Sequence, residues 1–86
     1  MILPVIHQHV YCMLKKEVNG NNEVKIGRIL YWAKWYMPHL QKPYYYKFIK
    51  EMMELGMLGK LNRDKYVVLT IKNFNPIPDH HGNLPW

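Results

Sequence analysis

The sequence of 86 residues contains no serine and only one cysteine, Cys12. The missing serine excludes a serine nucleophile. A lone cysteine cannot form an internal disulfide, which favours a reducing cytoplasm, or the cytoplasm of a host cell if the source is a virus. Because its neighbours are mostly apolar, Cys12 is expected to be a small buried hydrophobe.

Long apolar runs, metal-binding spacings and glycine-rich phosphate loops are also missing. No run approaches the roughly 20 apolar residues that span a bilayer, and the N-terminus lacks the pattern of a signal peptide. The histidines have no zinc-type spacing with the cysteine, and His7 and His9 do not share a helix face. We therefore expect a cytoplasmic protein without membrane contact, metal or cofactor, and not an enzyme.

Positive charge and aromatic side chains are abundant instead. Twelve Lys and Arg against six Asp and Glu give a net charge of +6, which favours a polyanionic partner. Hydrophobic residues make up 49% of the chain, enough for the core of one small domain. We expect this domain to span residues 1–74, followed by a proline-rich extended tail at 75–86.

Residues 43–55 predict a helix with one apolar and one polar face. The apolar residues recur at spacings of three and four: Tyr45, Phe48, Ile49, Met52 and Leu55. Pro43 suits the first helical turn, and Gly56 suits a left-handed C-cap. The polar face carries lysine and tyrosine first and glutamate last, against the helix dipole. This order is explained if the first half faces a phosphate backbone, and a solvated face with arbitrary charge order is the alternative.

Residues 57–61 and 66–71 predict two strands joined by a turn at 62–65. The second strand is rich in β-branched and aromatic residues. The turn contains Asn and Asp, whose side chains bond nearby backbone groups. The cations of this hairpin cluster at its tip: Lys60, Arg63 and Lys65.

Two further helices are predicted before this segment. The first covers residues 4–18, and its apolar stripe consists of Val5, Ile6, Val10, Met13 and Leu14. Residues 23–26 are either a short strand beside the hairpin or the early start of the next helix. We expect that helix from about Ile26, and Pro38 ends it because the residue before a proline is disfavoured in a helix. Its inward residues are Ile29, Leu30, Ala33 and Met37.

Two segments resemble the winged helix-turn-helix domain. The pattern FIxxMxxxGML at 48–58, followed by RDxxVxLT at 63–70, is similar to the recognition helix and wing of bacterial antibiotic-resistance regulators. The run KYVVLTIKNF at 65–74 also resembles the wing of phage replisome-organiser proteins. The likeness covers about residues 26–74. It implies an α+β fold of three helices, a two-stranded hairpin wing and an irregular C-terminal tail.

The helix before the turn departs from this family, which usually has a small, alanine-centred motif there. Only Ala33 fits, and bulky aromatic residues surround it: Tyr31, Trp32, Trp35 and Tyr36. One or two of them are expected in the core, and the others would form an exposed apolar patch. Trp86 of the apolar tail is grouped with this patch as a partner interface. The patch is a homodimer interface, a site for a protein partner, or a platform that stacks unpaired bases.

The resemblance implies a small, dimeric transcriptional regulator that binds double-stranded DNA. Helix 43–55 would enter the major groove, and the wing would touch a neighbouring minor groove. The residues expected to contact nucleic acid are Lys25, Arg28, Lys42, Tyr44, Tyr46, Lys47, Lys50, Lys60, Arg63 and Lys65. The alternative is a protein-interaction or replication-accessory winged helix of a virus or mobile element, which would use the aromatic residues at 31–36.

Overall fold

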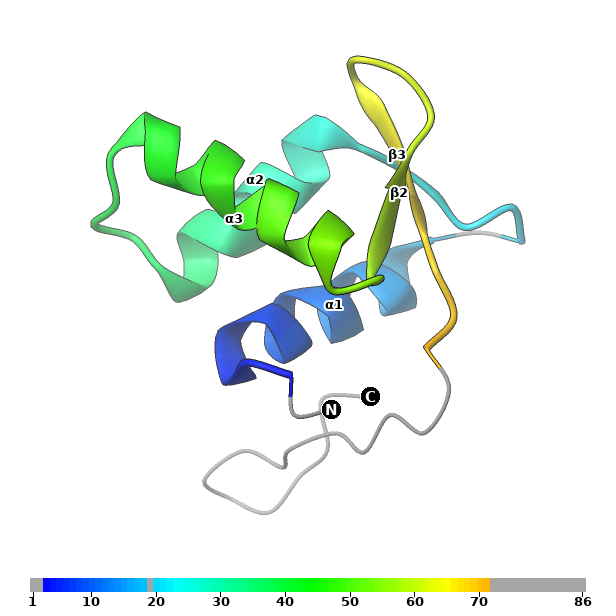
Figure 1. Ribbon diagram of the computed structural model, residues 1–86, viewed down its shortest axis with the longest axis horizontal. Coiled ribbons are helices and arrows are strands. Elements are labelled where there is room, and N and C mark those ends of the chain that lie inside the picture. Colours follow the sequence, from blue (N-terminus) through cyan, green and yellow to red (C-terminus); the bar gives the residue numbers. More distant parts are fainter. Residues whose placement is uncertain (1–2, 19, 72–86) are drawn as a thin grey trace.

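The computed structural model describes residues 3–18 and 20–71, in which three helices pack beside a three-stranded antiparallel sheet (Figure 1). Along the chain the elements are α1 (Val5–Glu17), β1 (Glu23–Lys25), α2 (Ile26–Tyr36), α3 (Lys42–Glu54), β2 (Leu58–Lys60) and β3 (Lys65–Val68). The fold is therefore α+β, as the sequence predicts. Trp86 and the predicted tail at 75–86 lie outside the described residues.

The hydrophobic core lies between the three helices and one face of the sheet. Its largest fully buried side chains are Val10, Leu14, Ile29, Met52, Met57, Leu58 and Val68. The predicted stripe of α1 was wrong at Val5, which is 47% exposed because it opens the first turn of the helix, at the margin of the core. Cys12 is buried as predicted, and Tyr11, which the stripe left out, is buried as well because α1 packs against both α2 and β3.

The turn between α2 and α3 is fixed at both of its ends. Met37, the residue before Pro38, leaves the helical region at φ −134° and ψ 68°, so α2 ends where the proline predicts. The hydroxyl of Tyr45 in α3 donates to the Met37 carbonyl. This bond ties the first part of α3 to the last turn of α2.

The end of α3 is a Schellman motif. Gly56 has φ 78°, the left-handed conformation predicted for it. Its amide donates to the Met53 carbonyl at 3.1 Å, and the Met57 amide donates to the Met52 carbonyl at 2.9 Å. Met52 and Met57 are both fully buried, so the chain turns straight from α3 into the core and then into β2.

The sheet has the strand order β1-β3-β2, so the predicted two-stranded hairpin was incomplete. Residues 23–25 form a strand beside β3, so the strand alternative for this segment is confirmed and the early helix start is wrong; the next helix begins at Ile26, as predicted. The Val68 amide donates to the Asn22 carbonyl, and the Ile26 amide donates to the Asp64 carbonyl, each at 2.8 Å. These bonds tie both ends of β1 to β3 or to the turn before it.

The strand bounds differ from the prediction at the turn and at the end of β3. Lys65 opens β3 instead of closing the turn, because it pairs with Lys25 in β1. Its carbonyl also accepts from the amides of Leu61 and Asn62, at 3.0 and 3.1 Å. β3 ends at Val68, three residues before the predicted end at 71, although the Leu69 amide still donates to the Met57 carbonyl at 3.0 Å.

Candidate nucleic-acid interface

The buried side of α3 determines which residues it exposes. Four apolar side chains of α3 are buried in the core: Tyr45, Phe48, Ile49 and Met52. Because a helix repeats every 3.6 residues, the side chains between them point outward. We call this exposed set the α3 cationic face, and it consists of Lys42, Tyr44, Tyr46, Lys47 and Lys50.

The lysines of the α3 cationic face have no acidic partner within the part of the chain that the structure describes. The first turn of α3 contains no acidic residue, and its N-cap, Gln41, makes no side-chain cap bond. Of the two glutamates near the end of α3, Glu51 is turned toward α1, where its carboxylate lies 3.3 Å from His7 Nε2. The lysines of this face therefore form no ion pair among the described residues, and exposed Glu54 lies one helical turn beyond Lys50.

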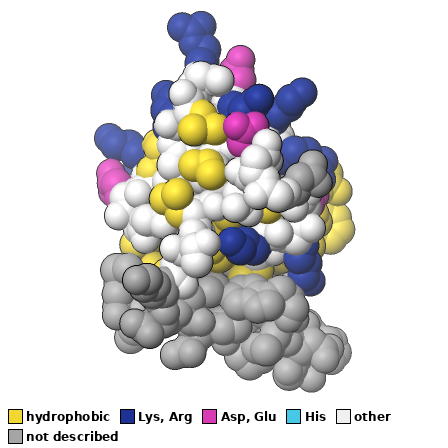
Figure 2. Space-filling view, turned by 90° about the vertical axis from the view of Figure 1, so that its right-hand side faces the viewer, with side chains coloured by type: hydrophobic (Ala, Val, Ile, Leu, Met, Phe, Trp, Pro, Cys, Tyr) yellow, Lys and Arg dark blue, Asp and Glu magenta, His cyan; other side chains and the backbone are white. Residues whose placement is uncertain are grey.

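The turn between β2 and β3 adds a second group of cations. Lys60 and Arg63 are exposed there, and Asn62 Oδ1 accepts from the Asp64 amide at 2.9 Å, the local bond expected of Asn in a turn. Lys65 follows at the start of β3, where its ammonium is 3.6 Å from the Glu23 carboxylate. In the view of Figure 2, Lys and Arg side chains lie above and at the margins of a strip of hydrophobic side chains, with Asp and Glu side chains among them.

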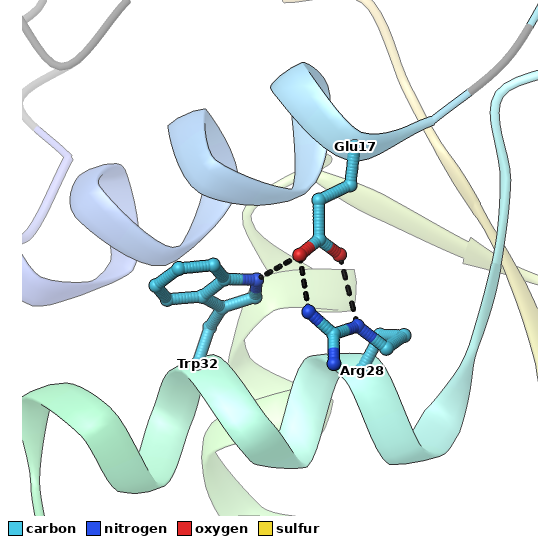
Figure 3. A network of polar contacts seen from close by, with 3 residues as sticks. All are labelled: Glu17, Arg28 and Trp32. Atoms are coloured by element: carbon cyan, nitrogen blue, oxygen red, sulfur yellow. Dashed lines mark hydrogen bonds and ion pairs between the residues drawn. The ribbon is translucent and has the colours of Figure 1, made fainter.

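Arg28, which the sequence predicts as a DNA contact, is paired within the protein (Figure 3). Its guanidinium donates to both carboxylate oxygens of Glu17, at 3.1 Å for Nε, and the Trp32 indole donates to the same carboxylate at 2.9 Å. The hydrogen bond from Arg28 is the main reason that the pKa of Glu17 is lowered. Lys25, the other predicted cation near the start of α2, is exposed on β1 opposite Lys65. The Glu17–Arg28–Trp32 network joins α1 to α2.

The aromatic residues at 31–36 divide into packed and exposed groups. Trp32 and Tyr36 pack against the core, and the ring of Tyr36 stacks on His9 at 5.4 Å. Trp35 is 65% exposed and Tyr31 is 46% exposed. The Arg28 guanidinium lies over the Tyr31 ring at 4.5 Å. Two of the four aromatic residues therefore pack against the core and two are exposed, as the sequence predicts.

A groove between α2 and α3 was missed by the sequence analysis. It has a volume of about 330 Å³, and its lining residues are Leu30, Lys34, Leu40, Lys42, Tyr45 and Tyr46. Lys42 and Tyr46 were predicted to contact nucleic acid, but Lys34 and Leu40 were not. The spacing of Leu30 and Lys34 places them on one side of α2, which was the available signal. The sequence around Leu40 does not indicate that this turn residue lies against Leu30 and Lys34.

Two groups of residues bear on other possible chemistry. Burial raises the pKa of the Cys12 thiol to about 12, so its reactive thiolate is hardly populated at neutral pH. In residues 3–18 and 20–71, no three His, Cys, Asp or Glu side chains come together as metal ligands would. Across the same residues, each helix is too short or too polar to cross a membrane.

Comparison of the chain with family models, with curated proteins and with solved structures found no match. The candidate interface is therefore described only by the charge and geometry of its residues. The structure places Lys42, Lys47 and Lys50 on one helix beside two exposed tyrosines, and it places Lys60 and Arg63 at the next turn of the chain. Arg28 and Lys65 each lie beside a glutamate.

Proposed function

We propose that this chain binds double-stranded DNA through the α3 cationic face, as a small regulator with a winged-helix arrangement. The observation that carries the proposal is the set of three exposed lysines on α3 without acidic partners among the described residues. Lysine beside exposed tyrosine is suited to phosphate, because the ammonium supplies charge and the hydroxyl supplies a hydrogen bond.

The dimensions of α3 are compatible with this role. Its 13 residues make a rod of about 20 Å, and the major groove of B-DNA is about 12 Å wide and admits one helix. The β2–β3 turn would act as the wing, with Arg63 directed to a narrow minor groove, where arginine is favoured. Because a single small module has a limited footprint, the regulator would act as a dimer.

Charge reversal on α3 tests the proposal. Lys47→Glu combined with Lys50→Glu replaces two attractive charges by two repulsive ones, so we expect affinity for a mixed-sequence duplex at low salt to fall by about 100-fold or more. Fluorescence anisotropy with labelled duplex measures this loss. Lys15→Glu with Lys16→Glu on α1 is the matched control, because it changes the net charge equally.

The control separates a defined interface from general electrostatic attraction. The proposal expects the α1 double variant to keep most of the affinity. Equal losses in both double variants would show that net charge alone attracts DNA, and unchanged binding by the α3 variant would remove α3 from the interface.

The exposure of Trp35 favours a second candidate function, binding of a protein partner or a second copy through α2. Trp35 and Tyr31 offer the large aromatic surfaces that are enriched in protein interfaces. Under this candidate, Tyr31→Ala with Trp35→Ala abolishes self-association or partner binding and leaves DNA binding unchanged. Sedimentation of this double variant and of the Lys47→Glu, Lys50→Glu variant, each with and without duplex, distinguishes the two functions.

A further inference from the structure

The groove between α2 and α3 has the size of a small-ligand site. Its volume of about 330 Å³ is at the lower end of the range of roughly 300–1,000 Å³ typical of such sites. One side comes from Leu30 and Lys34 of α2, and the other comes from the start of α3. Leu40, in the turn between the helices, contributes the remaining apolar surface.

The walls of the groove combine a fixed ring with an exposed ring. Tyr45 is 4% exposed, and its hydroxyl is bonded to the Met37 carbonyl, so its ring is a rigid wall. Tyr46 is 44% exposed and gives a second aromatic surface beside the leucines. Aromatic rings and leucine side chains together suit a flat, largely apolar group such as a nucleobase.

The charge of the groove is positive. Lys34 and Lys42 both line it, and neither takes part in an ion pair within the described part of the chain. The Lys34 ammonium lies 5.8 Å from the centroid of the Tyr45 ring, which keeps it beside the groove. The first turn of α3 adds no acidic residue to oppose an anion.

We propose that this groove holds one nucleotide, with the base against Tyr46 and the leucines and the phosphate between Lys34 and Lys42. A ligand with a flat ring and an anionic group matches both kinds of wall, and the volume suits one nucleotide. Lys42 and Tyr46 also belong to the α3 cationic face, so an unpaired nucleotide in a strand bound there can reach the groove. Binding of an unpaired nucleotide from DNA rests on the proposed DNA binding. A free nucleoside monophosphate offers the same base and phosphate and does not require DNA binding.

Three probes distinguish the sources: a fully paired duplex, the same duplex with one unpaired nucleotide, and free thymidine monophosphate. Stacking of a base on an aromatic side chain contributes enough that we expect the duplex with the unpaired nucleotide to bind about fivefold or more tightly than the paired duplex. Free thymidine monophosphate is expected to shift the NMR signals of Leu30 and Leu40 in a saturable way.

Two variants outside the predicted DNA contacts test the groove itself. Lys34→Gln removes a phosphate partner, and Leu40→Glu places a carboxylate in the groove. Both are expected to abolish the preference for the unpaired nucleotide and to leave binding of the paired duplex unchanged within about twofold. Lys16→Gln on α1, with the same charge change as Lys34→Gln, should retain the preference. If Leu40→Glu fails to fold, the preference for the unpaired nucleotide is tested with Lys34→Gln alone, because Lys34 is exposed.

The outcomes separate this proposal from the proposed DNA binding. If the protein binds paired duplex but shows no preference for the unpaired nucleotide and no saturable shifts with thymidine monophosphate, the groove proposal is overturned and the DNA interface stands. If thymidine monophosphate binds in a Lys34-dependent way without duplex binding, the groove site stands and the DNA interface fails. A preference that persists in both groove variants also overturns the proposal, because the unpaired nucleotide then binds elsewhere.

Discussion

Helices α2 and α3 follow one another in the sequence, but three of their cations differ in pairing: among the described residues, Arg28 of α2 forms an ion pair, and Lys47 and Lys50 of α3 do not. On α2, the Arg28 guanidinium is bonded to Glu17, and the same carboxylate accepts from Trp32. On α3, Lys47 and Lys50 lie three residues apart on an exposed face and have no acidic partner among the described residues. Arg28 therefore links two helices, whereas Lys47 and Lys50 form no ion pair among the described residues.

This difference shows that exposure and positive charge alone do not define an interface. Arg28 is as basic as any residue on α3, but contact with phosphate would require it to leave a carboxylate that it already contacts through two nitrogens. The α3 lysines would exchange only water and counterions for phosphate. The comparison predicts that substitutions at Arg28 and Trp32 mainly change stability and that substitutions at Lys47 and Lys50 mainly change binding.

The largest stability effect is expected at Trp32. Trp32→Ala removes a half-buried ring and its hydrogen bond to Glu17, and it should lower the free energy of unfolding by about 2 kcal/mol. Trp35→Ala is the matched control, because Trp35 is 65% exposed and should cost less than about 1 kcal/mol. Urea titration followed by circular dichroism measures both. Equal losses of unfolding free energy in the two variants would mean that Trp35 contributes to the stability of the fold as much as Trp32 does.

A smaller, pH-dependent effect is expected at Glu17. Its pKa is lowered from the ordinary value of 4.5, mainly by the hydrogen bond from Arg28, so its stabilisation is present above that value and is lost as pH falls through the folded pKa. Glu17→Gln should cost up to about 1 kcal/mol at neutral pH, since the pair is partly exposed. The difference in unfolding free energy between the two proteins should close on acidification. Glu54→Gln, an exposed glutamate without an ion pair in the described part, should show no such closure.

The smallest stability effect is expected on α3. Lys47→Gln with Lys50→Gln removes two exposed charges that contact no acid among the described residues, so the free energy of unfolding should change by less than about 0.5 kcal/mol. Thermal unfolding at low salt measures it. A loss of 1 kcal/mol or more would mean that these lysines have a structural role, like Arg28, and would remove the contrast between the two helices.

Local signals in the sequence determine α3 well. The predicted bounds of 43–55 differ from Lys42–Glu54 by one residue at each end, because Pro43 and Gly56 act on the backbone next to them. The buried and exposed sides also follow from the spacing of the apolar residues alone. The exposed lysine and tyrosine side chains of α3 were therefore predictable from the sequence.

Features that depend on distant pairing were not predictable in the same way. The sequence left residues 23–25 open between strand and helix, and they become a strand because β3, about forty residues later, supplies their partners. The ion pair of Arg28 was not predictable, because only the packing of α1 on α2 brings Glu17 to it. The α2–α3 groove needs Leu40 from the turn, whose position depends on how the two helices cross.

The salt dependence of duplex binding tests the central claim most directly. Five exposed cations without acidic partners in the described residues form the proposed contact set: Lys42, Lys47, Lys50, Lys60 and Arg63. If each neutralises one phosphate, the logarithm of the binding constant should fall against the logarithm of salt concentration with a slope of roughly −4 to −5. In the Lys47→Gln, Lys50→Gln variant, the slope should become shallower by about 2. A slope near zero in the unaltered protein, or an unchanged slope in the variant, would contradict DNA binding through α3.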